Sequence, residues 1–475
     1  MGQEIISSHF SETDFQRFQD RLAIETDLLK QRFSRPDVTE DDQYRVGFEL
    51  EACLVDKNNF QPAAENTAFI DHFNDPELAT MELARFNIEF NTPPFSITED
   101  LFSLLHSQLK NTWVKAQTTA GQLGTRILLC GILPTLQNRD LGLDNISEMK
   151  RYAALNRQIL KSRKGKPINL SIQGQDKLEL RHDDVMLEAA ATSFQIHFKT
   201  PWKKAKDIYN ASIMVSAPLL AASVNSPLLF GKTLWEETRI PLFEQAVATG
   251  NNIQRVSFGS GYVKNDILEY FNENLARYPV LLPMRFDTAA EEFSHVRLHN
   301  GTLWPWNRPL IGFNRQGTPH IRIEFRCLPA GPSLIDTVAN AAFYFGLSYH
   351  YANNHRTLLD FNHARNNFYQ AARNGLKAEF TWLDGKRYTA KKLLLTQLLP
   401  EAEMGLTAFG VAEGKSSEYL NIIRQRVETE QTGSAWQRTY LKKNQHDILE
   451  MTRTYARYQD TDQPVHTWNT SPNIT

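Results

Sequence analysis

Four short segments of this chain alternate between apolar and polar residues, and no other feature of the sequence constrains the fold as strongly. Residues 45–55 (RVGFELEACLV) place apolar side chains on one side and Glu49 and Glu51 on the other, because successive side chains of a strand point to opposite faces. Residues 85–91 (RFNIEFN) set apolar side chains against Glu89 in the same way. Both segments are therefore predicted to be strands with one buried face and one face of carboxylates.

The other two segments carry a histidine and arginines on the polar face. Residues 194–198 (FQIHF) present Gln195 and His197, and residues 320–327 (HIRIEFRC) present His320, Arg322, Glu324 and Arg326. A half-buried antiparallel sheet usually shows ordinary polar residues to water. Carboxylates, imidazole and guanidinium groups are instead the ones that bind metal ions and phosphate. The four segments together predict a metal and nucleotide site on a curved sheet.

The composition narrows the class of protein. The 475 residues include 52 basic and 54 acidic side chains, a formal net charge of −2, so nothing indicates a nucleic-acid surface. Hydrophobic residues make up 41% of the chain, enough for a sizeable core. Cys53, Cys130 and Cys327 make no CxxC spacing, which favours a reducing compartment. The start of the chain lacks the pattern of a signal peptide, so we expect a cytoplasmic protein.

Residues 211–231 carry no charge over about one bilayer thickness and need a test as a membrane span. They also contain Pro218, Pro227, Asn225 and several serines, and polar groups are costly to bury in lipid. We therefore expect a buried core helix followed by a loop, and no membrane segment.

Periodicity and capping signals divide the rest of the chain. Helices are expected at residues 13–33, from a capping box at 96–99 to about 121, at 147–161 with Ser147 as its cap, at 206–224, and from Ser333 to about 458. A further strand is expected at 126–133, a charged connection or hairpin at 176–188, strands and loops through 255–327, and a tail from about 460. This order predicts an α+β fold around a curved antiparallel sheet, with a helical C-terminal region.

The acids favour a divalent cation. Glu49 and Glu51 share a strand face about 7 Å apart at the backbone, and like charges so close repel each other. Glu89 and Glu324 can join them from neighbouring strands, with His197 as a nitrogen ligand. Oxygen ligands with one imidazole suit Mg²⁺ or Mn²⁺ better than zinc.

Each motif also has a plainer interpretation. An ExE pair is often two solvated acids, and a single histidine is often a hydrogen-bonded structural residue. Arg322 and Arg326 either neutralise the acids beside them or bind phosphate. The coincidence of four such strands favours the functional interpretation. The chain contains no Walker A loop and no GxGxxG, HExxH or GxSxG motif.

A series of segments resembles, in order, those of glutamate–cysteine ligase family 2, the carboxylate–amine ligases with a glutamine-synthetase-like fold. They are GFELEACLVD, ELARFNIEFNTPP, GILPTL followed by MKRYAALN, SFQIHFK, NSPLLFGKTLWEETR, TLWPWNRP and HIRIEFRCLPAGPSLID. Gln195 stands where the family often has a first histidine. The matching segments fall within about residues 45–350. We expect a catalytic domain over residues 1–350, including the helix at 13–33, and a helical region over 351–475 that packs on it.

The resemblance also implies a role for each matching residue. The metal ligands would be Glu49, Glu51, Glu89, His197 and Glu324. The catalytic residues would be Arg326, Arg322 and Glu82, the last as a metal ligand or as a base toward the amine. The substrate-binding residues would be Arg239, Arg308, Tyr152 and Asn225, with Arg239 or Arg308 on an α-carboxylate.

The implied reaction needs ATP and Mg²⁺ (or Mn²⁺). The γ-phosphoryl group of ATP would pass to the carboxylate of an amino acid, with the γ-carboxylate of glutamate as the expected one. An amine such as cysteine would then attack the acyl phosphate and form an amide. The acceptor stays open among thiol-bearing, alkyl and peptide amines and ammonia, and a homodimer is the assembly that the fold favours.

Three other classes remain as alternatives. A guanidino kinase would share the fold and the phosphate site, but would use a reactive cysteine, whereas Cys327 falls on the apolar face of its strand. A binding protein of the same fold would have lost an acidic ligand, and the acids are present. A metal-dependent hydrolase of small amides is the third.

Overall fold

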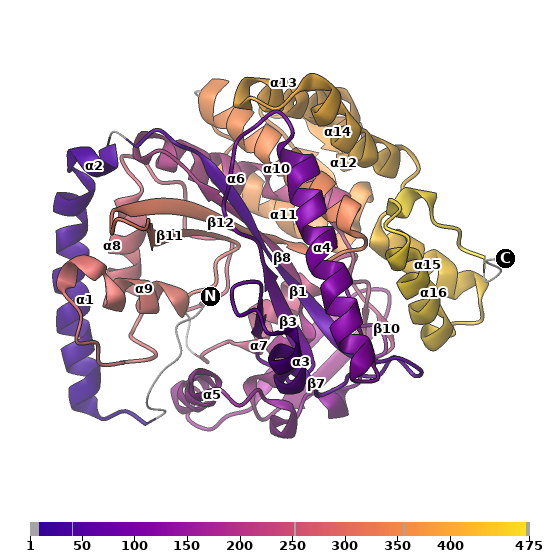
Figure 1. Cartoon of the computed structure of the whole chain (residues 1–475), viewed down its shortest axis with the longest axis horizontal. Coiled ribbons are helices and arrows are strands. Elements are labelled where there is room, and N and C mark those ends of the chain that lie inside the picture. The colour runs from indigo at the N-terminus through magenta and orange to yellow at the C-terminus, as the bar shows by residue number, and fades with distance from the viewer. Residues whose placement is uncertain (1–8, 40, 251–252, 355–356, 472–475) are drawn as a thin grey trace.

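One curled antiparallel sheet forms the centre of the protein. The computed structural model describes residues 9–39, 41–250, 253–354 and 357–471. The strand order is β11-β12-β8-β1-β3-β2, with β4 and β5 also paired to β1 (Figure 1). The strands are β1 (Arg45–Asp56), β2 (Ala79–Met81), β3 (Asn87–Asn91), β4 (Phe95–Ser96), β5 (Thr125–Leu128), β8 (Ser193–Lys199), β11 (Asn307–Phe313) and β12 (Pro319–Pro329). All four predicted strands are present, and the predicted sheet is confirmed.

The apolar face of this sheet lies in the core, as the alternation predicts. Phe48 on β1 is 2% exposed and Ile323 on β12 is 0% exposed. Helix α6 (Ala205–Ser223) packs against β12, and α10 (Leu334–Asn354) packs against α6. Tyr344 of α10 stacks on Phe325 of β12, with ring centroids 4.3 Å apart. The helices therefore cover one face of the sheet and leave the other face for the polar side chains.

Helix α6 contains the first part of the uncharged segment 211–231. Its side chains from Ile208 to Ser223 are all buried, and Pro218 lies inside it. The prediction of a buried core helix followed by a loop is confirmed. Within the described part of the chain, no helix is long and apolar enough to cross a membrane.

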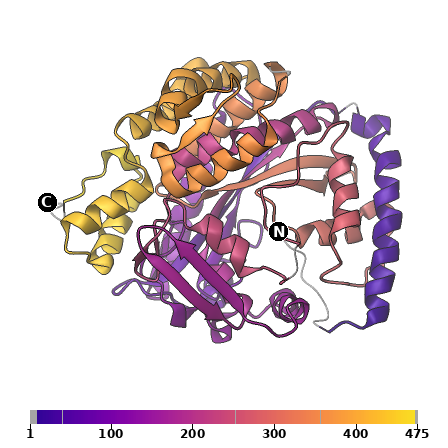
Figure 2. The same cartoon turned by 180° about the vertical axis from the view of Figure 1, so that it is seen from behind.

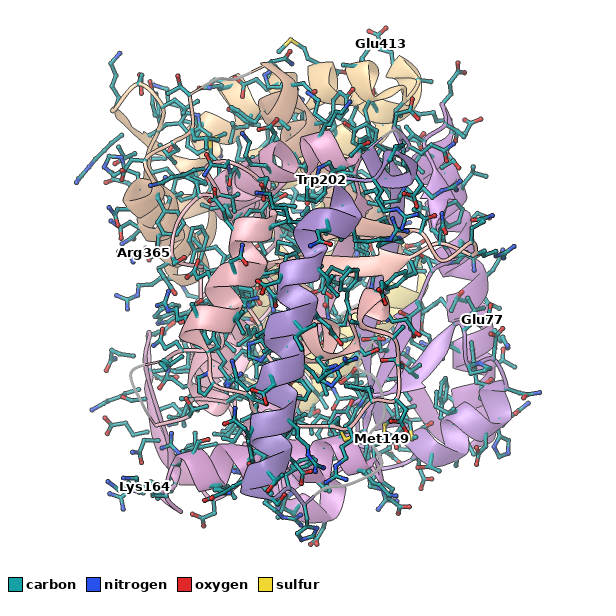
Figure 3. The ribbon with its side chains drawn as sticks, turned by 90° about the vertical axis from the view of Figure 1, so that its left-hand side faces the viewer. Glu77, Met149, Lys164, Trp202, Arg365 and Glu413 are labelled. Carbon is teal, nitrogen blue, oxygen red and sulfur yellow. The ribbon has the colours of Figure 1, made fainter. Side chains whose placement is uncertain are left out.

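Further helices surround the sheet. Helix α1 (Glu12–Phe33) packs against α8 (Leu268–Arg277) and α9 (Ser294–Gly301) at one end of the molecule. The last two helices, α15 (Gly433–Lys443) and α16 (Ile448–Asp460), lie at the other end (Figures 1 and 2). Trp202 lies near one end of α1 in Figure 3, where its ring is 4.8 Å from that of Phe33. The others are α2 (Pro36–Thr39), α3 (Asn66–Phe73), α4 (Leu101–Gln122), α5 (Lys150–Ser162), α7 (Arg239–Ala246), α11 (Phe361–Asn374), α12 (Ala390–Leu393), α13 (Leu399–Phe409) and α14 (Glu413–Glu428).

The C-terminal region is largely helical, as predicted, with one interruption by the hairpin of β13 (Glu379–Thr381) and β14 (Arg387–Thr389). After α16 the chain packs on the helices, because Val465 and Trp468 are 0% and 2% exposed in a core cluster. The expected tail is therefore ordered through residue 471, and residues 472–475 lie outside the described part. The division into two domains near residue 350 stays a prediction.

The two predicted helix caps are wrong. Helix α4 begins at Leu101, because Ser96 lies in β4 opposite Arg45, whose Nη1 donates to Ser96 Oγ at 2.9 Å. Helix α5 begins at Lys150, because Ser147 Oγ is used elsewhere, by the backbone of Glu82 and by Asn66 Nδ2. In both cases a contact distant in sequence takes the hydroxyl that a local pattern assigned to the helix.

Three other boundaries differ from the prediction. Strand β5 ends at Leu128, because the backbone N–H of Leu129 donates to Gln459 Oε1 at 2.9 Å instead of to a strand. The segment 176–188 is part of a hairpin, one of the two alternatives expected, but the hairpin begins earlier, because β7 (Lys177–His182) pairs with β6 (Ile168–Gln173) (Figure 2). The segment 255–327 contains the helices α8 and α9 as well as strands. Helix α8 buries Leu268, Tyr270 and Phe271, whereas the buried side chains of α9 are mostly polar and give no apolar pattern.

Candidate active site

The strand register brings the predicted site residues together. Glu51 of β1 lies opposite Glu89 of β3, and Glu324 of β12 lies opposite His197 of β8. Directly opposed residues of an antiparallel sheet project from the same face. These four side chains therefore belong to one surface, the face of the sheet that α6 does not cover.

Glu324 is held by two arginines. Arg308 Nε and Nη2 donate to its two carboxylate oxygens at 2.6 and 3.1 Å, and Arg326 Nη1 donates to Oε2 at 3.1 Å. The carboxylate is 0% exposed. Burial alone would raise the pKa of Glu324, but the guanidinium groups of Arg308 and Arg326 lower it to about 2. Glu324 is thus a buried carboxylate that stays ionised near neutral pH.

His197 bridges this group to the acids of β1. Its Nε2 lies 2.9 Å from Glu49 Oε1 and 3.9 Å from Glu324 Oε1, and Arg322 Nε donates to its Nδ1 at 3.1 Å. One ligand atom from each of Glu49, His197 and Glu324 lies within 4.8 Å of the others. Two carboxylate oxygens and one imidazole nitrogen are a donor set that fits a divalent cation.

Glu51 lies beside this cluster on the same face of the sheet and is held by two hydrogen bonds. It accepts hydrogen bonds from the backbone N–H of Ser193 at 2.6 Å and from Gln195 Nε2 at 2.8 Å. Gln195, which stands where the family often has a histidine, thus orients the carboxylate of Glu51. Burial, and then the charge of Glu82, raise the pKa of Glu51 to about 7.

Further carboxylates crowd around Glu51. Burial and the charges of Glu49 and Glu82 raise the pKa of Glu89 well above its usual range. Burial, Glu82 and Glu51 raise the pKa of Glu188 to about 8. Carboxylates that raise one another's pKa in this way lack enough neighbouring positive charge, and divalent cations would supply it. The residues therefore fit the metal that the sequence predicts.

Glu188 was missed by sequence reasoning. It lies in a 3-10 turn over residues 185–190, between the β6–β7 hairpin and β8, and Asp184 caps this turn by accepting from the N–H of Met186 at 2.9 Å. The only sequence signal is a single acid inside the apolar run VMLEAA. Its position beside the sheet depends on tertiary contacts.

Two cavities open on this surface and share Glu49 and Arg322. The acid cavity, about 240 Å³, contains Glu51, Glu82 and Glu188 and is closed by side chains of α5, α8 and α9. The larger cavity, about 850 Å³, extends the other way along the sheet. Its lining residues include Arg45, Lys199, His320 and Glu77, the last of which is labelled in Figure 3.

Tyr152 and Arg151 of α5 belong to the acid cavity. Tyr152 OH donates to Glu82 Oε2 at 3.2 Å, and Arg151 Nη2 donates to the Tyr152 oxygen at 2.7 Å. Both side chains line the acid cavity. Tyr152 and Glu82 therefore lie together on the lining of the acid cavity, and their roles stay predictions.

Two predicted substrate ligands lie elsewhere. Arg239 is 2% exposed, with its Nε 3.2 Å from Glu237 Oε1 and its Nη2 on the carbonyl of Cys327. Asn225 is 0% exposed, and its Nδ2 donates to Tyr455 OH at 2.9 Å. Neither residue lines the acid cavity or the larger cavity. Their contacts hold the loop after α6 against its neighbours.

A family model described as glutamate–cysteine ligase family 2 matches residues 45–457. The chain belongs to this family. It is accordingly an ATP-dependent enzyme that forms carbon–nitrogen bonds. Among curated proteins, no sequence matches this chain.

Two solved structures have a fold similar to that of this chain. Glutamate–cysteine ligase from Francisella tularensis, in complex with AMP, has a TM-score of 0.58 at 14% identity, and the match covers 91% of this chain and 90% of that one. A bifunctional glutathione synthetase from Pasteurella multocida has a TM-score of 0.51 at 13% identity, over 92% of this chain. This chain spans only 53% of that longer protein. The predicted glutamine-synthetase-like fold is confirmed.

Proposed function

We propose that this enzyme activates the γ-carboxylate of glutamate with Mg·ATP and joins it to an amine. The observation that supports the proposal most directly is that the buried ion-paired group Arg308–Glu324–Arg326 lies beside a cavity lined by several carboxylates. Such a site has both positive charge for phosphoryl oxygens and ligands for divalent cations. Membership of the family supports the class of reaction. The geometry of the site supports the role proposed below for each residue.

The nucleotide would occupy the larger cavity. Arg45, Lys199 and Arg322 line it, and a triphosphate needs positive charge along its length. Arg322 also lines the acid cavity. The γ-phosphate would therefore lie near Arg322, at the place where the two cavities meet.

The metal ligands would be those that the sequence predicts. Glu49, His197 and Glu324 form the tightest group, and Glu51 and Glu89 lie beside them on the same face. Mg²⁺ held there would neutralise charge on the phosphoryl group during transfer. Arg326, which contacts both Glu324 and Gln195, would stabilise the same oxygens.

The amino-acid substrate would lie in the acid cavity. Arg308 already uses its donors on Glu324 and on the carbonyl of Leu303, so it acts as a positioning residue rather than as a carboxylate ligand. Arg151, which lines the cavity beside Tyr152, is the better placed cation for the α-carboxylate.

Bond formation completes the reaction. The carboxylate oxygen bonds to the γ-phosphorus and releases ADP, then the amine nitrogen bonds to the acyl carbon and releases phosphate. The proton lost by the amine would pass to Glu82, whose Oε2 already accepts from Tyr152 OH.

Cys327 counts against the guanidino kinase. It is 0% exposed, and burial raises the pKa of its thiol to about 12, so it cannot act as a reactive thiolate near an acceptor.

The proposal is tested by ADP release from Mg·ATP across a panel of amines, with mass spectrometry of the products. We expect release to require both glutamate and an amine and to yield one new amide. A phosphoguanidine product, or ADP release without amide formation, would refute it.

A further inference from the structure

Part of the lining of the acid cavity is apolar. Leu155 of α5 and Leu282 belong to one buried cluster, and Leu298 of α9 and Trp304 pack against that cluster. All four side chains also line the acid cavity, and we call them the apolar wall. Phosphoryl transfer to a carboxylate involves only charged and polar groups, so that step has no use for this surface.

Helix α5 connects the apolar wall to the acids. Tyr152 and Leu155 are three residues apart, so they lie on the same side of the helix. Tyr152 contacts Glu82 through its hydroxyl group, 3.2 Å away. Burial, the charge of Glu82 and that of Glu188 all raise the pKa of Tyr152, which places Glu188 near the same ring. Carboxylates and apolar surface therefore meet along one helical turn.

We infer that the apolar wall holds the side chain of the acceptor, and that the acceptor is an amine bearing an aliphatic or aromatic group. This inference rests on the proposed function and specifies its second substrate. An amine reaches the site as an ammonium ion, which the carboxylate of Glu82 attracts. Its apolar group then lies against Leu155, Leu298 and Trp304. Ammonia would leave this surface unused.

The size of the expected effect follows from burial. Each methylene transferred from water to an apolar surface contributes about 0.8 kcal/mol, or roughly fourfold in kcat/KM. Lengthening the acceptor from methylamine to isoamylamine should therefore raise kcat/KM at least about tenfold, even if only part of the chain is buried.

The test compares amines of increasing apolar size with wild-type enzyme, Mg·ATP and glutamate. The series is methylamine, propylamine, isoamylamine and 2-phenylethylamine, with cysteine as the thiol-bearing competitor and hydroxylamine as a reference acceptor that has no side chain. We expect kcat/KM, divided by that for hydroxylamine, to rise along the series and to exceed the value for cysteine.

The outcomes separate the two proposals. A flat series, or a clear preference for cysteine, overturns the inference while hydroxamate formation still upholds the ligase. Failure to form any hydroxamate or amide refutes the proposed function, and the inference fails with it.

A matched pair of variants on α5 locates the effect. Leu155→Asn should lower the ratio of isoamylamine to hydroxylamine turnover about tenfold, because it places an amide in the apolar wall. Leu160→Asn is the control, since Leu160 is partly buried on the same helix but lines neither cavity. Trp304→Gln gives the same test from a loop, in case Leu155→Asn does not fold. Equal ratios in all variants and wild type would overturn the assignment.

Discussion

Arg308 and Glu324 face each other across β11 and β12 and form a two-pronged ion pair, with N–O distances of 2.6 and 3.1 Å. The pair lies beside the metal-binding candidates Glu49 and His197, so it fixes the third group of that cluster, the carboxylate of Glu324. The ion pair is present in the protein without substrates. Its contribution to stability can therefore be measured separately from its contribution to catalysis.

Removing Arg308 should destabilise the protein. Arg308→Ala leaves the buried charge of Glu324 with Arg326 alone, and such losses cost about 3–5 kcal/mol in the free energy of unfolding. Urea denaturation without ligands measures this. Arg277→Ala is the control, because Arg277 pairs with Glu273 at 2.9 Å on the surface, where such a pair contributes less than about 1 kcal/mol. Equal losses in the two variants would contradict the buried pairing.

Neutralising Glu49 should abolish metal-dependent turnover. Glu49→Gln keeps the shape of the side chain but removes the charge beside His197, so we expect ADP release to fall more than about 100-fold. Glu179→Gln, an exposed acid on β7, should retain wild-type rates. Undiminished turnover in Glu49→Gln over a Mg²⁺ titration would place the metal elsewhere.

Even the conservative substitution Arg326→Lys should impair catalysis. Arg326 contacts Glu324 and Gln195 with the same Nη1, and a lysine at this position offers a single compact charge. We expect Arg326→Lys to lower kcat by about 100-fold or more while the KM for ATP changes little. A variant with near-normal kcat would move phosphoryl stabilisation to other residues.

The stability of the metal-free protein should fall as pH rises. The pKa of Glu188 is raised from 4.5 to about 8 in the folded state, so between these values the folded protein binds more protons there than the unfolded chain does. The free energy of unfolding therefore decreases over this range. Denaturation at pH 5 and pH 8 should show a smaller decrease in Glu188→Gln than in wild type, and Mg²⁺ should restore part of the loss. Identical pH dependence in both proteins would argue against the raised pKa.

Most of the correct predictions came from the alternation of apolar and polar residues along the chain. The strand at Glu49 and Glu51, and that at Glu324 and Arg326, could be predicted because the period of two survives in any half-buried strand. Their grouping into one site followed from the number of such strands and from the family resemblance. The helix caps could not be predicted from local patterns, because Ser96 and Ser147 bond to residues far away in the chain.

Other parts of the site depend on contacts that the sequence does not display. Glu188 joins the acids only because the β6–β7 hairpin carries the following turn to the sheet. Arg308 was predicted to bind substrate, but it lies opposite Glu324 in the sheet and its guanidinium group is used to hold that carboxylate. Arg239 lies in a segment resembling the family, yet its guanidinium faces Glu237 in the interior.

The central claim, that a carboxylate is activated as an acyl phosphate, is tested most directly by isotope transfer. The enzyme would be incubated with Mg·ATP, an amine and glutamate carrying ¹⁸O in its γ-carboxylate, and the released phosphate analysed by mass spectrometry. Our account predicts that one ¹⁸O atom appears in phosphate for each amide formed. Amide formation without ¹⁸O in the phosphate would contradict it.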